Sequence, residues 1–140
     1  MNEQHRVGPV PAVSDEILER FDALCPDVEA EVVRLCMESD APGQAMGPDA
    51  EKMLQNGMRF VSKMLRATMR WGAGEMIADE VEWGRTRLPV YGVSAQMVFR
   101  NFQRYEQALM RRLTREEAAA IGPCFAELLK KQQTVVEGRG

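Results

Sequence analysis

Histidine is nearly missing from this sequence: His5 is the only one in 140 residues, and it lies before the first stretch with helical periodicity. A haem globin needs an axial ligand on a helix that faces the ring, and no helical segment here carries a histidine. The same shortage removes Ser/His and Cys/His catalytic pairs and metal sites built on two histidines. The sequence therefore predicts no haem and no metal site.

Converging catalytic groups of other kinds are missing as well. Acidic residues occur as adjacent pairs, such as Asp79 with Glu80 and Glu116 with Glu117. Neighbouring residues on a helix point in different directions, whereas general acid–base catalysis needs groups that meet. Gly72-Ala73-Gly74 is typical of a helix end rather than of a phosphate-binding loop. We therefore predict that the protein is not an enzyme.

Three further shortages bear on location and partners. The three cysteines, Cys25, Cys36 and Cys124, have no C-x-x-C spacing and are predicted to be reduced core residues. No apolar run approaches the roughly 20 residues of a membrane-spanning helix, and the first residues lack the apolar core of a secretory signal. Lysine and arginine are interleaved with glutamate at a net charge of −3. We expect a cytoplasmic protein that binds neither membrane nor nucleic acid.

The residues that are present predict one all-α domain. Residues 1–13 contain two prolines and a glycine without periodicity, which predicts a flexible N-terminal tail. Residues 14–137 predict a single helical domain, because apolar residues recur there with helical spacing and never alternate as in a strand. Pro26 separates the first two predicted helices, Gly72 ends the third, Ser94 suits an N-cap, and Thr114 begins a capping-box motif. We expect about six helices, over residues 14–25, 26–40, 48–71, 75–88, 94–109 and 114–136.

The third predicted helix combines methionines with cations. Thioether side chains adapt to a flat conjugated ligand or to a partner helix, and ordinary core filling is the alternative. Gly57, on the inner side of this helix, would allow close approach of a ligand or another backbone. A basic ridge on the same helix is, taken alone, typical of a solvated face. The methionines on this helix, among ten in the chain, are Met53, Met58, Met64 and Met69, and Met76 follows at the start of the next helix. The ridge is Lys52, Arg59, Lys63, Arg66 and Arg70.

The helix order resembles a globin fold without its haem ligand. Met58-Arg59-Phe60-Val61-Ser62 resembles the L-R-Y-V-T of the bilin-carrying helix of phycobiliproteins, and Leu88 to Ser94 resembles the turn that follows that helix. The resemblance spans roughly residues 48–136. It places Ala50 at the family's thioether cysteine, Met53 at its pyrrole-binding aspartate and Lys52 at its propionate-binding arginine. Non-haem globins without the anchoring cysteine are similar to the bilin biosynthesis-associated globins.

The resemblance implies a carrier or sequestration protein for a linear tetrapyrrole such as biliverdin, bound without a covalent bond. The pocket would lie between the third helix and the segment Glu75 to Leu88, with aromatic side chains on the pyrrole rings and cations on the propionates. A homodimer and an association with bilin-biosynthesis enzymes are the expected partners. The candidate binding residues are Lys52, Asn56, Arg59, Phe60, Lys63, Trp83, Arg87 and Tyr91.

An alternative hypothesis involves no pigment. The last two predicted helices resemble those of non-haem globin domains in bacterial stress-signalling systems of the stressosome type. On this interpretation the protein is a sensor or interaction module, and the amphipathic segment Ser14 to Ser39 forms the dimer surface.

Overall fold

The computed structural model describes residues 10–138 of the chain. Within this range the backbone forms six α-helices and one short 3-10 helix and contains no strand, which confirms the predicted all-α fold class. Within residues 10–138 no helix is both long enough and apolar enough to cross a membrane. The elements are α1 (Asp15–Asp40), α2 (Gly43–Met46), α3 (Ala50–Trp71), α4 (Gly74–Arg87), η2 (Leu88–Tyr91), α5 (Ala95–Met110) and α6 (Arg115–Val136).

The first two predicted helices are one continuous helix, α1, with Pro26 inside it. An interior proline removes a helical hydrogen bond and costs roughly 3 kcal/mol. The helix continues because its apolar stripe runs unbroken through the proline and is buried against α3 and α5. The sixth α-helix is instead α2, a single turn between the second and third predicted helices. The side chains of the α1 stripe that are at most 1% exposed are Leu18, Phe21, Val28, Val32 and Cys36.

Local signals at other helix ends are confirmed. The Ser94 hydroxyl accepts a hydrogen bond of 3.1 Å from the Met97 N–H at the start of α5. The Thr114 hydroxyl accepts from the Glu117 N–H at 3.1 Å, while the Glu117 carboxylate accepts from the Thr114 N–H at 2.9 Å. Gly72 ends α3 with a left-handed φ of 64°.

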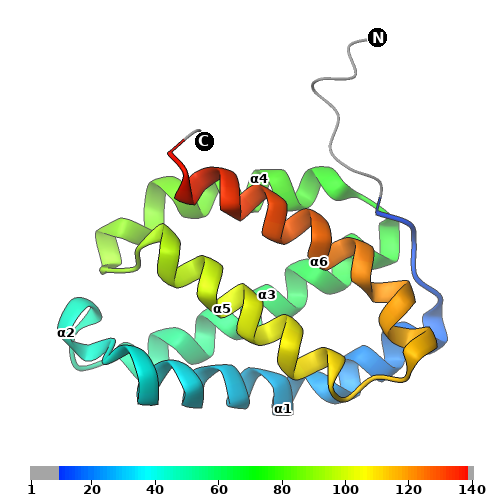
Figure 1. Cartoon of the computed structure of the whole chain (residues 1–140), viewed down its shortest axis with the longest axis horizontal. Coiled ribbons are helices and arrows are strands. Elements are labelled where there is room, and N and C mark those ends of the chain that lie inside the picture. The colour runs from blue at the N-terminus through cyan, green and yellow to red at the C-terminus, as the bar shows by residue number, and fades with distance from the viewer. Residues whose placement is uncertain (1–9, 139–140) are drawn as a thin grey trace, which may run out of the picture.

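The long helices pack around one core. Figure 1 shows α1 along one edge of the molecule and α4 along the opposite edge, with α5 and α6 crossing in front of α3. α1 packs against α3 and α5, and α6 packs against α5 and α4. Fully buried side chains from four helices meet between them: Phe21, Leu65, Tyr105 and Phe125.

The predicted tail over residues 1–13 falls partly outside the described residues, which begin at Val10. In the described part, Val10 and Val13 are buried, and the Val13 N–H donates a 2.8 Å hydrogen bond to the Met69 carbonyl in α3. A Cβ on Gly72 would lie 2.9 Å from the Val10 carbonyl oxygen, so the absence of a side chain there permits the contact. Residues 10–13 therefore belong to the packed domain.

Candidate functional site

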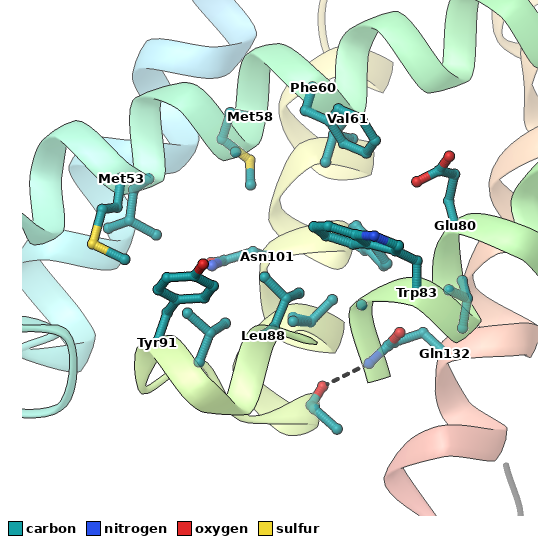
Figure 2. A pocket seen from close by; sticks show the side chains of 18 of the residues that line it. Met53, Met58, Phe60, Val61, Glu80, Trp83, Leu88, Tyr91, Asn101 and Gln132 are labelled. Atoms are coloured by element: carbon teal, nitrogen blue, oxygen red, sulfur yellow. Dashed lines mark hydrogen bonds between the residues drawn. The ribbon is translucent and has the colours of Figure 1, made fainter. Parts of the chain in front are cut away.

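A cavity of about 720 Å³ lies between α3, α4, η2 and α5 (Figure 2). This volume falls within the roughly 300–1,000 Å³ typical of small-molecule sites. α2 contributes Met46 to the lining and α6 contributes Gln132. The apolar lining side chains are Met46, Met53, Leu54, Met58, Phe60, Val61, Met64, Val81, Trp83, Leu88, Pro89, Tyr91, Val93, Val98 and Phe102.

One wall of the cavity is rich in methionine. Met53, Met58 and Met64 reach it from α3, and Figure 2 shows the sulfur atoms of the first two. Met69 is fully buried in the core instead, and Met76 does not line the cavity. The predicted methionine cluster therefore divides between the cavity wall and other places in the fold.

Gly57 lies on the cavity wall within α3. A Cβ built on it would meet no atom within 4 Å, so the space in front of this glycine is open. Within residues 10–138 no other backbone packs against Gly57, so of the two partners expected for this position the close backbone is not found there.

Aromatic side chains surround the opening of the cavity. Phe60 from α3 and Trp83 from α4 face each other with ring centroids 6.5 Å apart, and each is 48% exposed. Tyr91 in η2 is 57% exposed and also lines the cavity. The Arg87 guanidinium lies 5.7 Å from the centroid of the Trp83 ring. These rings are placed to contact a ligand that projects from the cavity.

The structure brings four of the eight predicted site residues to this cavity and leaves four off its lining. Asn56, Phe60, Trp83 and Tyr91 line it, whereas Lys52, Arg59, Lys63 and Arg87 do not. Arg87 remains near the opening through its contact with Trp83. Lys52 is exposed on α3.

Arg59 and Lys63 line a second hollow, of about 150 Å³, on the side of α3 that faces α1. Farther along this side, Arg66 binds Asp22 at 2.9 Å and Arg70 binds Asp15 at 3.2 Å. The basic ridge therefore follows the α1–α3 contact and does not border the large cavity.

Four polar lining residues were missed by the sequence analysis: Glu80, Arg85, Asn101 and Gln132. The Arg85 Nε donates to Glu82 at 2.9 Å, and this hydrogen bond raises the pKa of Arg85 and lowers that of Glu82. Gln132, which is 4% exposed, donates to the Ala95 carbonyl at 2.9 Å. The signal that could have identified Asn101 is its position three residues after Val98, on the inward stripe of α5.

Asn101 belongs to a polar cluster at the junction of α1 and α5. Arg104 Nη1 donates to Asn101 Oδ1 at 2.9 Å and to Asp40 Oδ2 at 2.7 Å, and Nη2 donates to Asp40 Oδ1 at 3.1 Å. Hydrogen bonding to the Arg104 guanidinium holds the pKa of Asp40 below its ordinary value. Asn101 Nδ2 lies 3.9 Å from the Cys36 sulfur.

Comparisons of the chain with protein-family models, curated proteins and solved structures found no match. A largely apolar wall, aromatic rings at the opening and two buried amides, Asn101 and Gln132, are features of a binding pocket.

A second polar network lies on the other side of α3 and does not reach the cavity. The Ser62 hydroxyl donates to Glu29 at 2.6 Å, so the Tyr105 hydroxyl, also 2.6 Å from Ser62, is the donor in that contact. Cys25 Sγ lies 3.7 Å from the Tyr105 oxygen. Burial raises the pKa of Tyr105 and of the Cys25 thiol. These hydrogen bonds join α1, α3 and α5, and the thiol, held neutral, is a poor nucleophile.

Proposed function

We propose that this protein binds a linear tetrapyrrole, without a covalent bond, in the cavity between α3, α4 and α5, and that it acts as a non-haem globin that carries or sequesters the pigment. The observation that carries the proposal is a cavity of about 720 Å³ walled by methionine and aromatic side chains. Flexible, polarisable thioethers suit the irregular outline of a flat conjugated molecule.

The segment that resembles the bilin-carrying helix of phycobiliproteins supports the same ligand. Met58, Phe60 and Val61 of this segment line the cavity, whereas Arg59 and Ser62 line the smaller hollow on the α1 side. The apolar positions of the motif are thus the ones that would contact the pigment. Phe60, Trp83 and Tyr91 would pack on its rings at the opening.

The mode of attachment follows from the lining residues. The chain has three cysteines, all of them buried and none of them lining the cavity, so no thiol is placed to form a thioether with the ligand. Arg85 lines the cavity and Arg87 lies beside Trp83, so these α4 cations would meet the propionates in place of Lys52, Arg59 and Lys63.

A titration with biliverdin tests the proposal. We expect the visible absorption band to sharpen and shift to the red, with saturation at one pigment per chain. Gly57→Phe would place a ring in the open space on the cavity wall and should weaken binding at least about tenfold, since it occupies the site that the pigment needs. Gly57→Ala, the matched control at the same position, should leave binding within about twofold of wild type.

Two further variants test where the pigment lies. Trp83→Ala should weaken binding because the ring borders the opening, whereas Lys52→Ala should leave it unchanged because this side chain does not line the cavity. An unaltered biliverdin spectrum with the folded wild-type protein would contradict the proposal. The pigment-free sensor or interaction module would then be the better hypothesis.

A further inference from the structure

We propose that Asn101 donates a hydrogen bond to the ligand and that the cavity therefore selects a molecule with an uncharged carbonyl at its buried end. This inference rests on the proposed role of the cavity as a ligand site, but it does not require the ligand to be a tetrapyrrole. Asn101 lies on the cavity wall and is 3% exposed. Figure 2 shows its side chain projecting from α5 toward the hollow, on the side of Tyr91.

The orientation of the Asn101 amide is fixed by its neighbour. Arg104 is only a donor, so the Asn101 atom 2.9 Å from Arg104 Nη1 must be the carbonyl oxygen. Arg104 is itself held by both carboxylate oxygens of Asp40. Rotating the amide by half a turn would place its NH₂ against the guanidinium. The nitrogen is therefore kept on the opposite side of the amide.

The NH₂ group of Asn101 lacks a strong acceptor among the described residues. Its nitrogen has one partner there, the Cys36 sulfur at 3.9 Å, and sulfur is a weak acceptor. An amide nitrogen carries two N–H bonds, and the weak acceptor Cys36 is the partner recorded for them within residues 10–138. A buried donor is stabilised more by an oxygen acceptor than by sulfur, and a ligand carbonyl would supply one.

The charges around the cavity explain why the carbonyl should be uncharged. Arg104 is already neutralised by Asp40. Arg85, the cation on the cavity lining, is paired with Glu82 at the exposed surface of α4. Gln132, the other deeply buried polar side chain on the wall, is a neutral amide. A carboxylate at the Asn101 end would lose its hydration without gaining a free cation, so ligand carboxylates would have to remain at the opening.

Prodan, a flat uncharged naphthalene ketone, is a suitable probe, and 6-propyl-2-dimethylaminonaphthalene, which has a methylene group in place of the carbonyl, is its matched analogue. We expect Asn101→Asp and Asn101→Leu to weaken prodan binding about tenfold while changing the affinity for the analogue less than about twofold. Asn101→Asp keeps an acceptor for Arg104 and loses the donor. Gln103→Glu introduces the same charge on the exposed side of α5, away from the cavity lining, and should leave prodan affinity unchanged.

The emission of bound prodan reports the hydrogen bond directly, because a hydrogen-bonded ketone emits at longer wavelength. Emission should therefore shift to the blue in Asn101→Asp as well as in Asn101→Leu, because both lose the donor although the aspartate keeps the site polar. Circular dichroism verifies that each variant is folded. Equal losses for both probes, unchanged prodan affinity, or no saturable binding of prodan to the wild-type protein would overturn the inference.

The biliverdin and prodan experiments test the two proposals independently. Binding of prodan through Asn101 without any binding of biliverdin would retain this inference and refute the tetrapyrrole proposal. Binding of biliverdin with no effect of Asn101 on prodan would refute this inference alone.

Discussion

Arg104 holds the carboxylate of Asp40 through two hydrogen bonds, of 2.7 and 3.1 Å, and so ties the middle of α5 to the last residue of α1. The Asp40 side chain is 7% exposed and the Arg104 side chain 16%, so water screens this pair less than the surface pairs of the protein. The same guanidinium orients Asn101 on the cavity wall. Stability and the proposed ligand recognition would therefore share one ion pair.

We expect Asp40→Asn to lower the free energy of unfolding by about 2 kcal/mol near pH 7, because it removes charge-assisted hydrogen bonds from a buried site. The Arg104 contact keeps the folded-state pKa of Asp40 below its unfolded value of about 3.9. The contribution of the pair is thus present above that value and is lost as the pH falls through the lowered folded pKa. Urea unfolding at pH 7 and pH 3 should show the difference between variant and wild type shrinking in acid.

Asp22→Asn provides the control for this comparison. Its pair with Arg66 has a similar length, 2.9 Å, but the two side chains are 42% and 40% exposed. Exposed pairs contribute little, so the loss should stay below about 1 kcal/mol. Equal losses in Asp40→Asn and Asp22→Asn would contradict the argument from burial.

Gly92→Ala should destabilise the protein by about 2–3 kcal/mol and weaken ligand binding. Gly92 has a φ of +81°, and a Cβ there would lie 2.0 Å from the Ala45 carbonyl oxygen, so η2 and α2 would have to separate. Gly43→Ala in α2 meets no atom within 4 Å and should be nearly neutral. Thermal unfolding of the two variants checks the prediction, and similar melting temperatures would refute it.

Gly57→Ala should raise the free energy of unfolding by about 0.5–1 kcal/mol, because alanine loses less conformational entropy than glycine in the interior of a helix. The added methyl group meets open space in the cavity. Chemical denaturation measures the gain. Destabilisation by this substitution would mean that the space in front of Gly57 is not open in solution.

All three thiols should be unreactive toward Ellman's reagent in the folded protein at pH 8. Burial raises the pKa of Cys124 to about 12 and also raises the pKa of Cys25 and Cys36, so little thiolate forms. Cys25, which is 9% exposed and lines the smaller hollow, should react first. Labelling of Cys124 should follow unfolding, and rapid labelling without denaturant would contradict its burial.

Signals confined to a few residues were sufficient to predict the ends of several helices. The Thr114 capping box and the Ser94 cap involve only neighbours three residues away, and both form as predicted. Pro26 was misjudged because residues far away in the sequence decide the outcome there. Burial of the α1 stripe against α3 and α5 offsets the missing hydrogen bond, and no local pattern reports that burial.

The position of the cations on α3 shows a similar limit. The apolar face and the methionines predicted that this helix would border a cavity. They did not predict which side of the helix α1 would cover. A signal was present in the acidic residues of α1: Asp15, Asp22 and Glu29 recur every seven residues and meet Arg70, Arg66 and Ser62 in antiparallel order. Their match becomes meaningful only once the two helices are known to be adjacent.

The part of the cavity wall formed by α2 and η2 is held in place by tertiary packing and not by helix stability. Each of these elements is four residues long, too short to be stable as an isolated helix in water. Their order therefore comes from packing against one another, above all where Gly92 meets Ala45. Loosening of this contact would enlarge the opening beside Tyr91, so exchange of the proposed ligand would be controlled by two short segments while the long helices stay intact.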